Sequence, residues 1–158
     1  MQLESKNVGY SSGSGDPAAD APAIFFVHGA GMDHSVWVMP ARYFARHGYR
    51  VMAIDLPGHG KTDGPALDSI DDMADWLLGL ILATAANASE IVLVGHSMGT
   101  LICLSLAARQ PELAKKLVLL GTSVPMPVSD TCSMPPKTTI MPPLIWPTLG
   151  ATASAAYS

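Results

Sequence analysis

Residues 91–109, IVLVGHSMGTLICLSLAAR, restrict the possible folds more than any other part of the chain. Ile91–Val94 is a continuous run of aliphatic residues, which is typical of a strand covered on both faces. Apolar residues recur at helical spacing from about Met98 onward. The pentapeptide GHSMG joins the two, and glycine tolerates the dihedral angles that so short a turn requires. We therefore expect Ser97 at the apex of the turn, with its hydroxyl exposed.

The rest of the chain alternates between strand and helix patterns. Besides Ile91–Val94, strands are predicted at Ala23–Val27, Tyr49–Ile54 and Lys116–Gly121, and helices at 36–47, 69–85 and 98–110. Ser69 is the expected N-cap of the second helix, because an acidic residue follows three positions later, close to a capping box. This alternation predicts an α/β fold, with a mostly parallel sheet and helices on both faces.

The two ends of the chain differ from this middle part. Residues 1–22 are rich in Gly, Ser, Ala, Asp and Pro, and we expect a flexible N-terminal segment with a short strand near Asn7–Tyr10. Residues 130–158 are dense in proline and show neither strand nor helix periodicity. We interpret them as an irregular tail produced by truncation or by an altered reading frame.

Composition narrows the class of partner. The chain has 158 residues, within the range of one domain, and a net charge of −4, which does not favour nucleic-acid binding. The most apolar window, Trp76–Ala86, is shorter than the roughly 20 residues of a membrane span. Cys103 and Cys132 do not form a disulfide framework, and Cys103 is expected to be a small buried residue. With no secretory signal pattern, we expect a reducing, cytoplasmic compartment.

The pentapeptide around Ser97 matches the pattern G-x-S-x-G of a nucleophile elbow. Its setting between a strand and a helix favours that interpretation over an unrelated Gly-Ser turn. A serine nucleophile also needs fixed donors for the negative charge on the attacked carbonyl oxygen. The backbone amide of Met98, at the helix N-terminus, is one candidate, and the amide of Ala30 in the loop HGAG is the second. We expect His28, in the same loop, to have a structural role.

Four segments in this order resemble the α/β-hydrolase family: FFVHGAGMDHSVW, VMAIDLPGHGKT, IVLVGHSMG and KLVLLGTSVPMPV. The resemblance covers about residues 23–129, the N-terminal half of such a fold, and implies a partial hydrolase core with the tail at the position of a cap. It implies that Ser97 is the nucleophile, that Met98 and Ala30 form the oxyanion hole, and that the substrate is a small ester or acyl compound. Gly29 and His96 are expected beside the substrate.

The catalytic triad of this family runs Ser, then Asp or Glu, then His along the chain. After Ser97 the acidic residues are Glu112 and Asp130, and no histidine follows. Glu112 is expected to lie far from the site. His28 and His59, on loops at the same end of the sheet, are alternative bases. We therefore expect a serine hydrolase whose chain is incomplete and has little activity.

Other chemistries find little support in the sequence. GHGKT resembles the end of a phosphate-binding loop, but Asp55 stands where that pattern requires its first glycine. The five histidines are scattered without the paired spacing of metal ligands, so neither a metal nor a cofactor is expected.

A second interpretation is a non-catalytic binding or interaction module that retains the hydrolase scaffold, and the missing histidine favours it. The sequence does not indicate an oligomeric state. It does indicate that the strand 116–120 has an open hydrophobic edge, which would lower solubility or require a partner.

Overall fold

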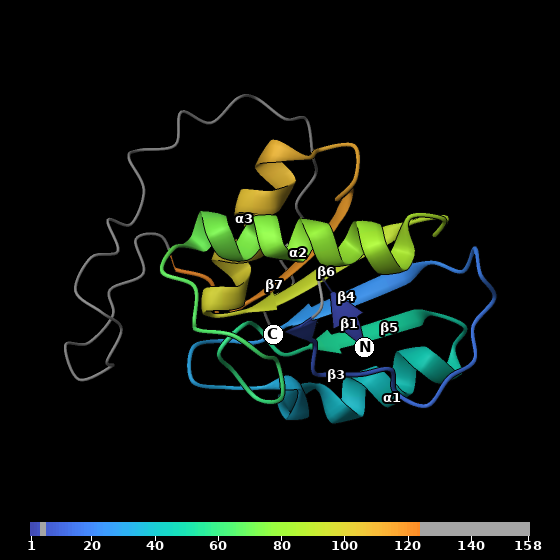
Figure 1. Ribbon diagram of the computed structural model, residues 1–158. Coiled ribbons are helices and arrows are strands. Elements are labelled where there is room, and N and C mark those ends of the chain that lie inside the picture. Colours follow the sequence, from blue (N-terminus) through green and yellow to red (C-terminus); the bar gives the residue numbers. More distant parts are fainter. Residues whose placement is uncertain (4–5, 124–158) are drawn as a thin grey trace.

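The computed structural model describes residues 1–3 and 6–123 (Figure 1). Five strands form one sheet in the order β3-β5-β4-β6-β7. Their bounds are Tyr10–Ser11 (β3), Ala23–Val27 (β4), Arg50–Ile54 (β5), Ile91–His96 (β6) and Lys116–Leu120 (β7). β4 to β7 run parallel, and β3 pairs antiparallel with β5. The predicted mostly parallel sheet is confirmed.

Helices cover both faces of this sheet, as predicted (Figure 1). A 3₁₀ turn, η1 (His34–Trp37), leads into α1 (Val38–Arg46) on one face. The other face carries α2 (Ile70–Ala85) and α3 (Met98–Arg109), which pack against each other. This arrangement agrees with the partial core that the resemblance of the motifs implies.

Side chains alternate between two core clusters along each central strand. Phe25 of β4 and Leu93 of β6 belong to the cluster beneath α2 and α3. Phe26 and Val94, one residue further on, belong to the cluster with Trp37 and α1. Because both faces are buried, the central strands consist mainly of apolar residues, which explains the continuous hydrophobic runs in the sequence.

Local expectations for α2 and α3 are also confirmed. The Ser69 hydroxyl accepts a hydrogen bond from the Asp72 amide at 3.0 Å and donates to the Asp72 carboxylate at 2.7 Å, which caps α2. Cys103 is fully buried in α3, and burial raises the pKa of its thiol to about 12. It therefore behaves as a small apolar residue.

The N-terminal segment contains three short strands where the sequence predicts one near Asn7–Tyr10. β1 (Gln2–Leu3) pairs with β2 (Lys6–Asn7), and β3 joins the main sheet. Hydrogen bonds to residues far away in the sequence hold the backbone of this N-terminal segment. The Asp55 amide donates to the Gly9 carbonyl, and the Gly9 amide donates to Thr62 Oγ1, both at 2.9 Å. Such partners, some 50 residues away, leave no periodic pattern in the sequence. The predicted tail 130–158, with Asp130 and Cys132, lies outside the described residues.

β7 forms one edge of the sheet in the described part of the chain. Its exposed and half-buried residues alternate, and Val118 and Leu120 are 44% and 43% exposed. A flat strand edge carrying apolar side chains is a template for pairing with another chain. Within residues 1–3 and 6–123, no strand pairs with the outer side of β7, in line with the expectation of an apolar edge.

We expect Val118→Lys to raise the soluble, monodisperse fraction of the protein, because a charged side chain at an edge opposes strand pairing. Light scattering measured against protein concentration would detect the change. The control is Leu82→Lys, since Leu82 is 54% exposed on α2, away from the edge. Equal improvement in both variants would show that general surface hydrophobicity, not the β7 edge, causes association.

Candidate active site

Ser97 is a one-residue turn between a strand and a helix. β6 extends to His96, two residues beyond the predicted end, and α3 begins at Met98. Ser97 has φ 51° and ψ −119°, a left-handed conformation that is rare for a residue with a side chain. Such backbone strain costs on the order of 1–3 kcal/mol and persists only where the surrounding structure enforces it. The side chain is half-buried.

Backbone hydrogen bonds hold Ser97 from both sides. Its amide donates to the Leu120 carbonyl of β7 at 2.9 Å. Its carbonyl accepts from the Thr100 amide at 2.8 Å and from the Thr100 hydroxyl at 2.6 Å. Sequence analysis missed Thr100, although Ser and Thr side chains commonly bond a carbonyl three or four residues earlier.

The two glycines of the motif allow three backbone segments to meet. A Cβ on Gly95 would contact the Gly99 carbonyl, and a Cβ on Gly99 would collide with the carbonyl oxygens of Val27 and His28. α3 therefore packs its first turn directly on β6 and on the end of β4. The motif spacing follows from this close approach.

We expect Gly99→Ala to destabilise the protein by about 1–3 kcal/mol or more, because the added methyl overlaps fixed backbone atoms. The matched control is Gly79→Ala in α2, where a Cβ would meet nothing within 4 Å. That change should stabilise by about 0.5–1 kcal/mol through helix propensity. Urea unfolding monitored by circular dichroism measures both. A neutral Gly99→Ala would contradict the close packing.

The loop after β4 lies beside Ser97. A Cβ on Gly29 would be 3.2 Å from the Ser97 Cβ and 3.2 Å from His96 Nδ1. Ala30 follows Gly29 and packs against the core cluster beneath α2 and α3. The His96 ring also packs edge-on against Trp37, with ring centroids 6.5 Å apart. The structure thus brings the predicted residues Gly29, Ala30, His96, Ser97 and Met98 to one end of the sheet.

His28 is buried and has a structural hydrogen-bond pattern. Its Nε2 accepts from the Leu56 amide at 3.1 Å, so its Nδ1 carries the proton and donates to the Gly29 carbonyl at 2.7 Å. Burial lowers the pKa of the imidazole, which keeps it neutral. With both ring nitrogens bonded, His28 joins the loops after β4 and β5. It is not placed to take a proton.

His28 should make the protein less stable in mild acid. As pH falls below about 6.5, the ordinary pKa of histidine, His28 binds a proton in the unfolded chain but not in the folded one. The free energy of unfolding is therefore full above that pH and decreases below it. We expect the urea midpoint to fall between about pH 7.5 and about pH 5.5. His28→Gln should be less stable but should show a smaller fall. An unchanged pH slope in the variant would contradict this assignment.

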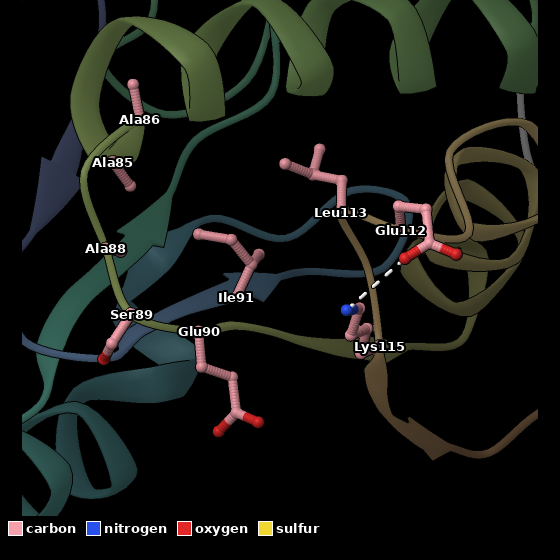
Figure 2. Close-up of a pocket in the computed structure, with 9 residues that line it drawn as sticks. All are labelled: Ala85, Ala86, Ala88, Ser89, Glu90, Ile91, Glu112, Leu113 and Lys115. Carbon is pink, nitrogen blue, oxygen red and sulfur yellow. Dashed lines mark ion pairs between the residues drawn. The ribbon is translucent and has the colours of Figure 1, made fainter.

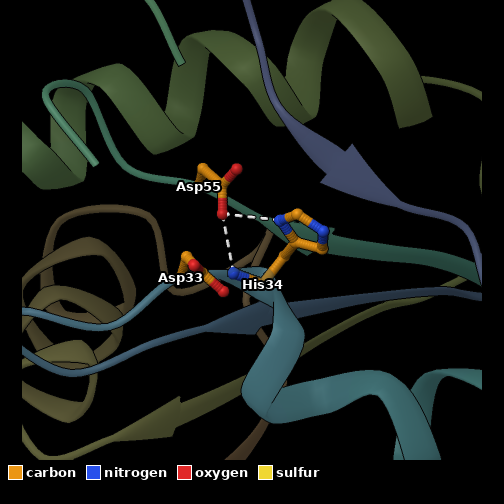
Figure 3. A group of neighbouring side chains, drawn as sticks. All are labelled: Asp33, His34 and Asp55. Atoms are coloured by element: carbon orange, nitrogen blue, oxygen red, sulfur yellow. Dashed lines mark hydrogen bonds and ion pairs between the residues drawn. The ribbon is translucent and has the colours of Figure 1, made fainter. Parts of the chain in front are cut away.

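Asp55 connects the neighbouring loops at the same end of the sheet (Figure 3). Its fully buried carboxylate accepts from the amide and Nδ1 of His34 at 2.6 and 2.8 Å, and from the Lys61 amide at 2.9 Å. Sequence analysis noted Asp55 only as a mismatch to a phosphate-binding loop. The signal available was its position directly after an apolar strand, where buried acids commonly accept loop amides.

Asp33, His34 and Asp55 place three potential metal-ligand atoms within 4.8 Å of one another (Figure 3). Sequence spacing did not predict this grouping, because residues 33 and 55 meet only through the fold. The acceptor positions are engaged: Asp33 caps η1 through the Ser35 amide at 2.7 Å, and Asp55 holds three N–H donors. These bonds give the cluster a structural role in joining loops.

The cavity drawn in Figure 2 lies at the opposite end of the sheet. It measures about 190 Å³, and its lining includes Ile91 at the start of β6 and the ion pair of Glu112 and Lys115, whose charged atoms are 3.4 Å apart. Glu112 is therefore remote from Ser97, as predicted. Parallel sheets of this kind bind ligands at the carboxyl ends of the strands, where Ser97 lies.

Comparison with known proteins decides the family. The model of the alpha/beta hydrolase fold family matches residues 22–153. The chain belongs to the alpha/beta hydrolase family. The match continues past residue 129, where the resemblance seen in the motifs ends.

Two relatives illustrate the range of this hydrolase family. The chain is 33% identical over 113 residues to (E)-2-((N-methylformamido)methylene)succinate hydrolase of Acinetobacter baylyi, covering 71% of this chain and 40% of the relative. It is 31% identical over 115 residues to human Protein ABHD8, covering 70% and 26%. The chain thus spans less than half the length of these relatives.

Solved hydrolase structures agree with the fold. A bacterial membrane phospholipase A superimposes with a TM-score of 0.66 at 30% identity, covering 75% of this chain and 37% of that one. A thioesterase domain from the curacin biosynthetic pathway gives 0.61 at 25% identity, covering 74% and 41%. Within residues 1–3 and 6–123, no helix combines the length and apolar character needed to cross a bilayer.

Proposed function

We propose that this alpha/beta hydrolase is a serine hydrolase that attacks carboxylic esters or related acyl bonds through Ser97. The observation that carries the proposal is the strained backbone of Ser97, with φ 51°, at a one-residue turn between β6 and α3. A strained strand-to-helix turn presents a nucleophile above the sheet. Strained residues cluster at active sites, which supports a functional role for Ser97.

The oxyanion of the tetrahedral intermediate would be held by two backbone amides. Met98 is the first residue of α3, so its amide has no partner within the helix and lies at the positive end of the helix dipole. Ala30 follows Gly29, whose backbone lies against Ser97. Fixed donors of this kind typically contribute about 2.7–4 kcal/mol each to lowering the barrier. The Ser97 oxygen forms a bond to the carbonyl carbon and gives its proton to a base from solution. The bond from that carbon to the leaving oxygen or nitrogen breaks, and the alcohol or amine takes up a proton and leaves. Water then hydrolyses the acyl group from Ser97.

A serine hydroxyl also needs a base, and the chain's own histidines do not offer a clear one. All five precede Ser97 in the sequence. His28 has both ring nitrogens bonded, and His59 Nδ1 bonds the Pro57 carbonyl at 3.1 Å. We therefore expect the 158-residue chain to be a weak catalyst, with the residual rate that an oxyanion hole gives by itself, about 10³–10⁴-fold over water.

The substrate class rests on the acyl chemistry of Ser97. Two of the similar structures are a phospholipase A and a thioesterase, names that denote cleavage of acyl bonds. The likeness supports an ester or thioester of small-molecule size for this chain, with Gly29 and His96 beside the acyl group.

A non-catalytic binding module is the second candidate. The commitment of both His28 ring nitrogens to structural bonds favours it. Such a module would bind an ester without turning it over, and its affinity would be unaffected by loss of the Ser97 hydroxyl.

A fluorophosphonate probe separates the two candidates. We expect slow covalent labelling of the chain, no labelling of Ser97→Ala, and unchanged labelling of the control Ser89→Ala, since Ser89 lies beside the distant cavity. Because general-base catalysis contributes about 10²–10⁴-fold, added imidazole should accelerate labelling, by about tenfold for a mobile base. Mass spectrometry locates the adduct. Equal labelling of Ser97→Ala would exclude Ser97 as the nucleophile.

A further inference from the structure

We propose that the outer face of η1 and α1 is a docking surface for an anionic lipid bilayer. The face carries large apolar side chains that point into solvent: Met32, Val36, Met39 and Tyr43 are 37%, 48%, 74% and 57% exposed. Val36, Met39 and Tyr43 are spaced by three and four residues, which places them along one side of the segment formed by η1 and α1, and Met32 lies in the loop that leads into it. A continuous exposed apolar stripe on a soluble domain marks an interaction site more often than scattered single residues do.

Cationic side chains lie on the same outward face. Arg42 and Arg46 are exposed on α1, three and seven residues after Met39. Neither takes part in an ion pair within the described residues. Between residues 30 and 54 the single acidic residue is Asp33, whose carboxylate caps η1. η1 and α1 themselves carry two arginines and no acidic residue, so this helical segment is positive on a chain of net charge −4, and the exposed Asp16 follows the glycines that pack on its opposite side. A positive segment is complementary to an anionic surface.

The opposite side of α1 is fully occupied. Ala41 and Ala45 are buried against the sheet, and the backbone of Gly13 and Gly15 packs on them so closely that a Cβ at either position would overlap α1. α1 is the helix that covers this face of the sheet in Figure 1. In the part of the chain that the structure describes, the exposed apolar side chains of η1 and α1 therefore lie outside the core.

The residue types favour lipid headgroups over a protein groove. Arginine binds phosphate through paired N–H donors, and Tyr is enriched at the boundary between lipid and water. The Tyr43 ring stacks on His47 with centroids 4.1 Å apart, and His47 Nδ1 donates to the Tyr43 carbonyl at 2.7 Å, which limits the freedom of both rings. Apolar and cationic side chains are both present on the exposed side of α1, as expected of a segment that lies at a membrane interface.

This surface begins near the candidate active site, because Met32 donates its amide to the Gly29 carbonyl at 3.3 Å. Docking would bring the loop of Gly29 and Ala30 toward the lipid. The inference concerns surface binding and does not depend on catalysis by Ser97.

Vesicle flotation tests the proposal, since protein aggregates sediment while vesicle-bound protein floats. We expect the chain to float with vesicles of phosphatidylcholine and phosphatidylglycerol and not with phosphatidylcholine alone. Raising the salt from about 0.1 M to about 1 M should release it, because screening shortens from about 10 Å to about 3 Å. Binding to both vesicle types alike, or to neither, would overturn the proposal.

Paired variants locate the surface. Arg42→Gln with Arg46→Gln should weaken binding about 30-fold, since each basic residue at an anionic membrane contributes about fivefold. The control, Lys6→Gln with Lys115→Gln, removes the same charge from exposed positions elsewhere and should weaken binding much less. Circular dichroism verifies folding of both. An equal loss of vesicle binding in the control variant would overturn the assignment. The assignment would also be overturned if the protein self-associates and the arginine variant dissociates it, because the surface would then bind a second copy of the chain.

Discussion

The structure depends on close backbone contacts that are possible only because two residues of the motif are glycines. α3 can begin directly behind Ser97 because Gly95 and Gly99 let its first turn approach β6 and the Val27 carbonyl of β4. The contact fixes the strained dihedral angles of Ser97 and the distance between the turn and the loop after β4. Interiors packed at crystal density resist the shift that a methyl group would demand there. The candidate chemistry follows from packing that is set before any substrate is present.

A second layer of polar contacts steadies the loops around this turn. The Asp55 carboxylate binds the amide and ring of His34 and the amide of Lys61, while His28 joins the loops after β4 and β5. A buried carboxylate without donors would be very costly, so these loops are tied to one arrangement. The loop that contains Ala30 is held between Ser97 at one end and Asp55 at the other. Residues that hold the loops around a site determine how precisely its catalytic groups are positioned.

Much of the fold and of the turn at Ser97 could be predicted from the sequence, because both depend on patterns among neighbouring residues. The runs around Phe25 and Leu93 show both-face burial, and the motif around Ser97 shows an abrupt turn, so the parallel sheet and the elbow could be predicted. What could not be predicted rests on partners far apart in the chain. The segment before Ala23 is held by bonds to β5 and to the loop after it, and Asp55 meets His34 only in the folded chain. The sequence pattern indicates which face of a strand or helix a residue occupies. Its contacts with residues far away in the chain are seen only in the fold.

The most direct test of the account is a crystal structure of the protein with a phosphonate bonded to Ser97. The central claim is that the bent backbone places the Ser97 oxygen beside converging amide donors of Met98 and Ala30. The account predicts a phosphonyl oxygen about 2.7–3.1 Å from both amide nitrogens, the range for an oxyanion hole. A phosphonyl oxygen that points away from both amides, with Ser97 in an ordinary backbone conformation, would contradict it.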